Sequence, residues 1–360
     1  MKSKVAVLKT TPETVMEDYH KLMNLAGYQE VISKDHDTAL KINISWHVFY
    51  PACSTTPWQL DGVIQGMLQD GYKKELIHGC HNRTVVVSAK KGELANKHKQ
   101  VVVDKHGLRN VHLYENEEWI TYQPKGEMLV LHDIFKKGIE IPKRFIGENI
   151  IHLPTVKTHI FTTTTGAMKN AFGGLLHEKR HWTHSCIHET LVDLLTIQKE
   201  IHPGVFAVMD GTFVGDGPGP RCMVPYVKDY ILASSDQVAI DAIAAKMMGF
   251  DPMNLKYIRL AHEKGLGVGR PEEIEIVGED LSGINWKFDG TPTTFASKGQ
   301  HLLYWGPLKP LEKFLLRTVL APWSYAASIL YHDYYWYNFI GKKRVKEALE
   351  TKWGKLFQAY

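Results

Sequence analysis

Closely spaced cysteines are missing from this chain of 360 residues, whose four cysteines are Cys53, Cys80, Cys186 and Cys222. No two of them form a C-x-x-C pair. Zinc ribbons and ferredoxin-type clusters need thiolates that lie close together in the sequence, so neither kind of site is encoded. We therefore expect reduced thiols and no intrinsic iron–sulfur cluster.

A strong charge of one sign and long apolar runs are also missing. The formal net charge is +4 and the pI is about 8.6, which is too mild for the basic signature of a nucleic-acid-binding protein. No apolar stretch of signal-peptide length follows the N-terminal lysines, and no run approaches the roughly 20 residues of a membrane span. These features favour a cytoplasmic protein. Hydrophobic residues make up 44% of the chain, which excludes a largely disordered protein.

Apolar runs of strand length alternate with segments of helical periodicity. Strands are expected at residues 4–9, 39–44, 84–88, 149–153, 205–209 and 230–233, and helices at 12–26, 58–71 and 237–248. This alternation is typical of an α/β fold with a mostly parallel central sheet and helices on both faces. We assign residues 1–300 to this domain and residues 301–360 to a helical, aromatic-rich C-terminal extension.

Polar loops follow four of the expected strands, at Asn43, Pro154, Asp210 and Ser234. In open parallel sheets, ligands bind beside the carboxyl ends of the strands. The second of these loops combines lysines, threonines at 162–165 and glycines. Ammonium groups, hydroxyls and glycine N–H groups together suit a phosphate or a carboxylate, although an ordinary solvated loop has a similar composition.

The order of motifs in these loops resembles that of the domain-of-unknown-function 362 family. Its K-x-H…G-x-x-K-N-x-x-G segment is matched by Lys157, His159, Gly166, Lys169, Asn170 and Gly173. Its D-G…G-x-G-P segment is matched by Asp210, Gly211, Gly215, Gly217 and Pro218, and its S-x-D-x-x-x-x-D segment by Ser234, Asp236 and Asp241. Many members carry a ferredoxin-like iron–sulfur domain. The resemblance therefore implies redox chemistry, for which this chain would need an external electron donor.

Four residues are candidates for catalysis: Lys157, His159, Lys169 and Asp210. Imidazole titrates near neutral pH, so His159 is predicted to move a proton, while the lysines bind the anion. Asp210 is predicted to support a partner or a metal, although it also fits a turn former. The predicted substrate-binding residues are Asn43, Thr164, Thr165, Asn170 and Gly173. We expect the four catalytic candidates to face one cavity.

Histidines gather after the second loop. If residues 178–194 are helical, His177, His181, His184 and His188 lie at three- and four-residue spacings on one face. Such a face could hold a divalent metal, with His177, His181 and His184 as the predicted ligands. A polar face without a metal is the alternative, because the H-E-x-x-H order is absent.

The sequence thus predicts an enzyme that acts on a small anionic metabolite, a carboxylate or a phosphate, by redox or proton-transfer chemistry. The alternative is a non-catalytic ligand- or metal-binding protein that docks to a membrane or a partner through its C-terminus. Residues 311–346 combine aromatic and apolar runs with a basic segment at 342–346, which is the pattern of a peripheral membrane anchor. The same aromatic residues would also suit packing against the core.

Overall fold

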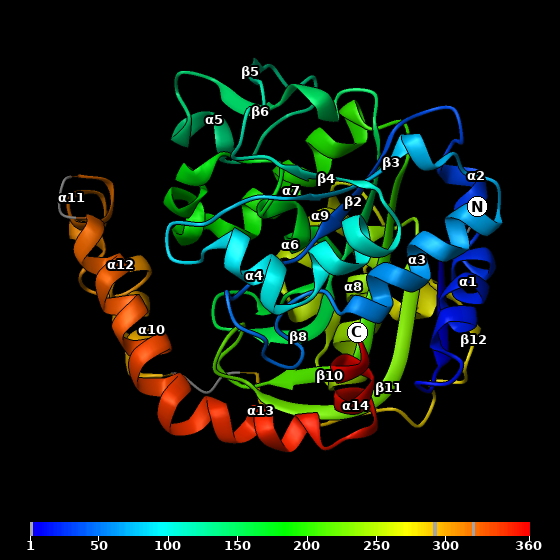
Figure 1. The fold of residues 1–360 in the computed structure, drawn as a ribbon. Helices are drawn as coiled ribbons and strands as arrows, with labels where there is room; N and C mark the ends of the chain where they lie inside the picture. The colour runs from blue at the N-terminus through cyan, green and yellow to red at the C-terminus, as the bar shows by residue number, and fades with distance from the viewer. Residues whose placement is uncertain (1–2, 291–293, 319–320) are drawn as a thin grey trace.

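The protein is built around one large twisted sheet in the computed structural model, which describes residues 3–290, 294–318 and 321–360 (Figure 1). Neighbouring strands follow the order β12-β1-β11-β10-β7-β2-β3-β4, with β8 beside β10 and β9 beside β8. Among the described strands of this sheet, only β9 and β11 run against the rest. The expected mostly parallel α/β sheet is confirmed.

The strands of the large sheet are β1 (Lys4–Lys9), β2 (Thr38–Ile42), β3 (Ile77–His81), β4 (Arg109–His112), β7 (Asn149–Leu153), β8 (Thr155–His159), β9 (Thr163–Thr164), β10 (Val205–Asp216), β11 (Val224–Ser234) and β12 (Glu275–Gly278). A separate hairpin consists of β5 (Trp119–Tyr122) and β6 (Ile139–Pro142). The α-helices of the main domain are α1 (Val15–Leu25), α2 (Tyr28–Val31), α3 (Pro57–Gln69), α4 (Ala89–Ala95), α5 (Leu131–Ile134), α6 (Gly166–Phe172), α7 (Ile187–Ile201), α8 (Gln237–Met248) and α9 (Lys256–Glu263). Shorter or irregular helices are η1 (Lys74–Leu76), η2 (Gln100–Lys105), η3 (Lys143–Phe145), η4 (Glu178–Cys186), η5 (Pro252–Asn254) and η6 (Pro271–Glu273).

Helices cover both faces of the sheet, and the side chains of its strands alternate between two apolar clusters. In β10, Val205, Ala207 and Met209 pack with α7 and α8, whereas Phe206 and Val208 pack with α1 and α3 on the other face. This two-residue alternation follows from the pleat of a strand. Burial on both faces explains why the sequence reads as short, nearly continuous apolar runs.

Two expectations about the strands are wrong. Residues 84–88 form turns in place of a strand, because Thr84 Oγ1 accepts hydrogen bonds from the amides of Val86 and Val87. Ser88 then caps α4. The loops expected after Pro154 and at Asp210 are strands as well: β8 contains Lys157 and His159, and β10 continues through Asp210 to Asp216.

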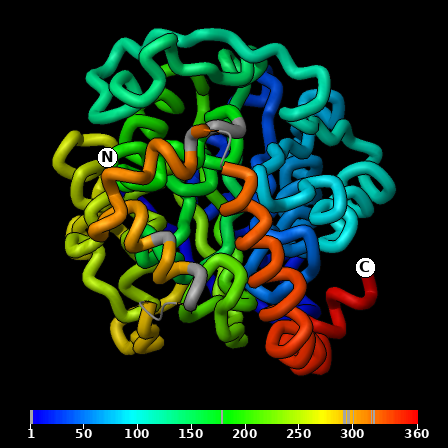
Figure 2. The backbone as a smooth tube through the Cα atoms, turned by 90° about the vertical axis from the view of Figure 1, so that its left-hand side faces the viewer, coloured from blue at the N-terminus to red at the C-terminus, as the bar shows by residue number. Residues whose placement is uncertain are grey.

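The C-terminal region is helical, as expected, and has two parts. Its elements are α10 (Phe295–Tyr304), η7 (Lys309–Leu311), α11 (Glu312–Arg317), α12 (Ala321–Ile329), η8 (Leu330–Gly341), α13 (Lys342–Leu349) and α14 (Lys352–Ala359). Helices α10 to α12 stand at one edge of the molecule, and α13 and α14 then return towards β10 and β11 (Figures 1 and 2). None of the described helices is long and apolar enough to cross a bilayer.

Candidate functional site

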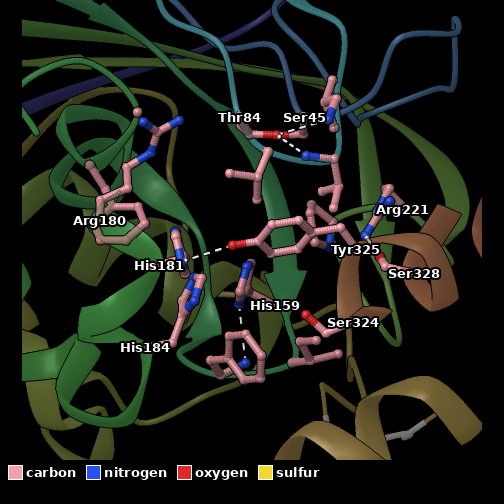
Figure 3. A pocket seen from close by; sticks show the side chains of 18 of the residues that line it. Ser45, Thr84, His159, Arg180, His181, His184, Arg221, Ser324, Tyr325 and Ser328 are labelled. Carbon is pink, nitrogen blue, oxygen red and sulfur yellow. Dashed lines mark hydrogen bonds between the residues drawn. The ribbon is translucent and has the colours of Figure 1, made fainter. Parts of the chain in front are cut away.

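A large cavity lies between the main domain and the C-terminal helices. Its volume is about 1030 Å³. The wall on the domain side comes from the ends of β2 and β8, from α6 and from η4, and the opposite wall comes from α10 to α12 and η8 (Figure 3). The carboxyl edge of the parallel strands therefore opens into this space, as expected for an α/β sheet that binds a ligand.

The wall of this cavity combines cationic side chains with many apolar ones. Its cationic residues are Lys41, Lys169, Arg180, Arg221 and Lys298, and its described lining contains no aspartate or glutamate. Leucines and aromatic rings of the C-terminal helices, among them Leu316, Trp323 and Tyr331, form the apolar part. A wall of this composition favours an anionic group joined to an apolar one.

Lys41 is buried at the end of β2. Its Nζ donates a hydrogen bond to the carbonyl oxygen of Ile42 at 2.7 Å, and burial lowers its pKa to about 8. Asn170 of α6 donates to the carbonyl oxygen of Lys41 at 2.8 Å, so α6 and β2 hold each other in place. A Cβ atom on Gly174 would lie 2.6 Å from Cε of Lys41, which explains why glycine stands there.

Lys169 is half-buried and faces the same space. Burial lowers its pKa to about 7, and the nearby charges of Lys157 and Arg180 act in the same direction. A bound anion would favour the protonated form and raise this pKa again. Lys169 is therefore the lysine of the wall whose protonation is most readily changed near neutral pH.

The position of Lys169 depends on the N-terminus of α6. The carboxylate of Asp241, in α8, accepts hydrogen bonds from the amides of Ala167 and Met168 at 2.5 and 3.1 Å. Gly166 has a φ of +76°, and a Cβ atom there would lie 2.2 Å from Oδ1 of Asp241. The contact between Asp241 of α8 and the first turn of α6 thus fixes the start of α6, and with it the position of Lys169 three residues after Gly166.

His159 lines the cavity as a neutral imidazole. Its Nδ1 accepts a hydrogen bond from the amide of Phe161 at 3.1 Å, so its proton is carried by Nε2. Burial holds its pKa well below the ordinary value, and the charge of Lys169 lowers it further. In this tautomer His159 is suited to donate a hydrogen bond to an anion. It cannot act as a general base in this tautomer, because Nε2 carries the proton and has no free lone pair.

Two of the four catalytic candidates do not line this cavity, so the expected common cavity is wrong for Lys157 and Asp210. Nζ of Lys157 is held by the carbonyl oxygen of Cys53 and by Thr155 Oγ1, at 2.7 and 2.9 Å. The carboxylate of Asp210 is fully buried and accepts hydrogen bonds from side chains of four residues, Tyr19, Thr56, Trp58 and Thr212. Strand pairing carries both residues into the interior.

The predicted substrate-binding residues are mostly at the wall. Asn43, Thr165, Asn170 and Gly173 line the cavity, and the buried Oγ1 of Thr165 has no hydrogen-bond partner among the described residues. Thr164 does not line it, because its hydroxyl bonds to the hydroxyl of Tyr257 at 2.8 Å. Their roles towards a substrate stay predictions.

The predicted metal ligands do not converge. Residues 178–186 form the 3-10 helix η4 and α7 begins only at Ile187, so the expected single helical face is broken. His181 and His184 line the large cavity, whereas His177 packs edge-on against Trp119 at a separate small cavity. Among the described residues, these three histidines form no group within metal-binding distance.

Comparison with known proteins places the chain in a family. The family model described as a domain of unknown function, DUF362, matches residues 38–246, which is more than half of the chain. The chain belongs to this family. It is also similar to a thylakoid-associated protein of Synechocystis sp., with 25% identity over 169 residues. That match covers 42% of this chain and 51% of the relative, so the chain spans about half the length of the curated protein it matches.

Several residues at the site of this DUF362 member are not evident from its motifs. Lys41 has a signal in the sequence, since a lysine inside an otherwise apolar strand is unusual. Arg221 and Tyr325 belong to no motif that would mark them in the sequence. In the fold, Arg221 Nη2 donates a hydrogen bond to Ser328 Oγ at 3.1 Å, and the hydroxyl of Tyr325 lies 3.1 Å from Nε2 of His181 (Figure 3). Only the folded C-terminal region brings them to the cavity.

Proposed function

We propose that this DUF362 protein is an enzyme that binds an anionic metabolite, a carboxylate or a phosphate with an apolar part, and moves a proton on it. The carboxylate-free, cationic wall of the large cavity carries this proposal. Lys169 is the proposed acid–base group, because its pKa is about 7 in the free chain and rises when an anion binds, so its protonation changes near neutral pH. His159 donates a hydrogen bond from Nε2, and Lys41 supplies charge. Redox chemistry on the same ligand would need an external electron donor.

Replacing Lys169 with methionine should weaken anion binding by about tenfold or more, because a hydrogen bond to a charged group contributes about 1.5–3 kcal/mol. Isothermal titration calorimetry with inorganic phosphate and with decyl phosphate measures this loss and separates the head group from the apolar chain. Lys143→Met is the matched control, since Lys143 is exposed on η3 and pairs with Glu118. Equal affinity in wild type and Lys169→Met would contradict the proposed anion site.

Proton transfer is tested separately from binding. In D2O, the wild-type chain should exchange a carbon-bound proton in at least one member of a panel of aliphatic carboxylates and phosphate esters, followed by NMR. The Lys169→Met variant should not catalyse this exchange. If decyl phosphate binds tightly but no member of the panel exchanges, the protein binds the anion without catalysis.

The stability of the protein should respond to the pKa of Lys169. Below about pH 7 the lysine is protonated in both the folded and the unfolded chain. Between pH 7 and the ordinary value of 10.5 the folded chain binds fewer protons, so its free energy of unfolding rises with pH. Relative to Lys169→Met, wild type should gain about 1–3 kcal/mol from pH 7 to pH 10 in urea titrations. A constant difference would mean that Lys169 titrates normally.

The non-catalytic alternative, a ligand-binding protein that docks to a membrane, is favoured by the outer surface of the C-terminal helices. Phe314, Tyr334 and Phe339 expose more than half of their surface and do not line the cavity, and basic side chains of 342–346 follow. Aromatic rings beside lysines suit the interface of an anionic bilayer. The relative described as thylakoid-associated supports a membrane as the partner. The cavity beneath would then receive an anionic amphiphile from that surface.

A further inference from the structure

A second group of chemically active side chains lies outside the large cavity, at the ends of β3 and β4. His81 and His112 are the last residues of these two parallel strands and stand opposite each other in the register. Glu93, from α4, points between them. Its Oε2 lies 3.4 Å from Nε2 of His81 and 3.0 Å from Nε2 of His112. None of the three residues lines the large cavity.

The spacing of these three atoms is that of ligands around a metal ion. All the candidate ligand atoms lie within 4.8 Å of one another. With metal–ligand bonds of about 2.1 Å, the edges of a tetrahedron are about 3.4 Å long. The two separations from Glu93 therefore match the edges of a tetrahedral site. Two imidazoles and one carboxylate are also ligands that Zn²⁺ prefers.

The contacts around His112 leave its Nε2 available to a metal ion. Its Nδ1 lies 3.0 Å from Oε2 of Glu115, and a carboxylate only accepts, so Nδ1 carries the proton. The other ring nitrogen, Nε2, lies 3.0 Å from Oε2 of Glu93. That contact lacks hydrogen-bond geometry in spite of its 3.0 Å length. A metal ion between the two groups would replace this contact with two coordination bonds.

His81 gives an independent indication. Its side chain is 1% exposed, its Nδ1 has no hydrogen-bond partner among the described residues, and its Nε2 has only the long 3.4 Å contact with Glu93, which lacks hydrogen-bond geometry. Buried polar atoms are almost always satisfied, so an imidazole with two unsatisfied nitrogens is unusual. Coordination of Nε2 would satisfy the nitrogen that faces Glu93.

Outer contacts orient two of the three ligands. Asn110 donates a hydrogen bond to Oε1 of Glu93, which leaves Oε2 directed at the two rings. Glu115 fixes the tautomer and the orientation of His112. A carboxylate that holds the far nitrogen of a ligating histidine is a common feature of zinc sites.

We propose that His81, Glu93 and His112 form a binding site for a divalent transition-metal ion of the Zn²⁺ class. Three protein ligands leave a further position for water or an exogenous group, which is the ligand count of catalytic zinc sites. Tyr114 stacks on His112 and lines a neighbouring cavity of about 160 Å³. Asn82, which follows His81 in the sequence, lines both this small cavity and the large one.

The full chain, freed of metal by chelation and reloaded with Zn²⁺, should retain one ion per chain by inductively coupled plasma mass spectrometry. Competition with a chromophoric chelator gives the affinity. Glu115→Gln should weaken it by about 10–100-fold, because Glu115 is an outer contact on the surface and its loss leaves the fold intact. Glu93→Gln and His112→Asn remove a proposed ligand and should weaken the affinity for Zn²⁺ more than Glu115→Gln does. Co²⁺ in place of Zn²⁺ should give the visible absorption of a four-coordinate ion.

His181→Asn is the matched control, because His181 lies at the large cavity and should leave Zn²⁺ affinity unchanged. The proposal is overturned if wild type retains no stoichiometric Zn²⁺, if Glu115→Gln and His112→Asn bind it as tightly as wild type, or if only His181→Asn loses it. Each of these results leaves the anion-binding test with Lys169→Met unaffected, since the two sites share no ligand residue.

Discussion

Replacing Asp210 with alanine should lower the free energy of unfolding by about 3–5 kcal/mol, because several buried hydrogen-bond donors lose their shared acceptor. The carboxylate of Asp210 accepts from Tyr19 on α1, from Trp58 and Thr56 at the start of α3, and from Thr212. It therefore links both helices to β10. Alanine would leave these buried donors without an acceptor, and each unsatisfied group costs about 1–3 kcal/mol. Urea unfolding followed by tryptophan fluorescence measures the loss.

Asp104→Ala is the control for this experiment, because Asp104 is exposed and only approaches Lys99 at 3.8 Å. It should change stability by no more than about 0.5 kcal/mol. The folded fraction of Asp210→Ala should still bind decyl phosphate, since Asp210 does not line the cavity. Normal stability combined with lost activity would instead restore Asp210 to a catalytic role.

The regular elements were predictable where local pattern and tertiary burial agree. The helix expected at 237–248 is α8 with the same bounds, because Asp236 caps its N-terminus and Gly249 adopts the left-handed conformation at its end. Strand β3 has no apolar run that would mark it in the sequence. Its sequence IHGCH is polar, yet every residue is buried between β2 and β4. The apolar residues 85–87 were the more strand-like pattern, and the hydrogen bonds that Thr84 accepts from Val86 and Val87 decide against a strand.

The candidate site was predictable only in part. Ligands bind beside the carboxyl ends of parallel strands, and this rule correctly placed His159, Lys169 and Asn170 at a cavity. The rule depends on the direction of the strands and not on side-chain contacts. It could not tell that residues 155–159 and 210–216 belong to strands and not to loops, which is why Lys157 and Asp210 were misplaced. The opposite wall comes from α10 to α12 and η8, and no sequence pattern links these helices to the strand ends.

The C-terminal region divides into a part that the fold needs and a part that it leaves exposed, and one pair of variants should separate them. Trp353→Ala should lower the free energy of unfolding by about 3–5 kcal/mol, the usual loss for a buried tryptophan. Trp353 is fully buried, its ring centre lies 5.2 Å from that of Trp58, and its Nε1 donates to Asp229 at 2.7 Å. Urea unfolding measures this effect, and membrane binding per folded molecule should not change.

Phe339→Ala should show the opposite pattern. Its side chain is 75% exposed on η8, so its loss should change the free energy of unfolding by no more than about 0.5 kcal/mol. Burial of a phenylalanine in a membrane interface contributes about 1.5–3 kcal/mol, so binding to phosphatidylcholine vesicles with added phosphatidylglycerol should fall about tenfold or more. Co-sedimentation with these vesicles measures the loss. If wild type and Phe339→Ala sediment equally, or if wild type does not bind at all, residues 311–346 are not a membrane anchor, and the exposed aromatic surface needs a protein partner instead.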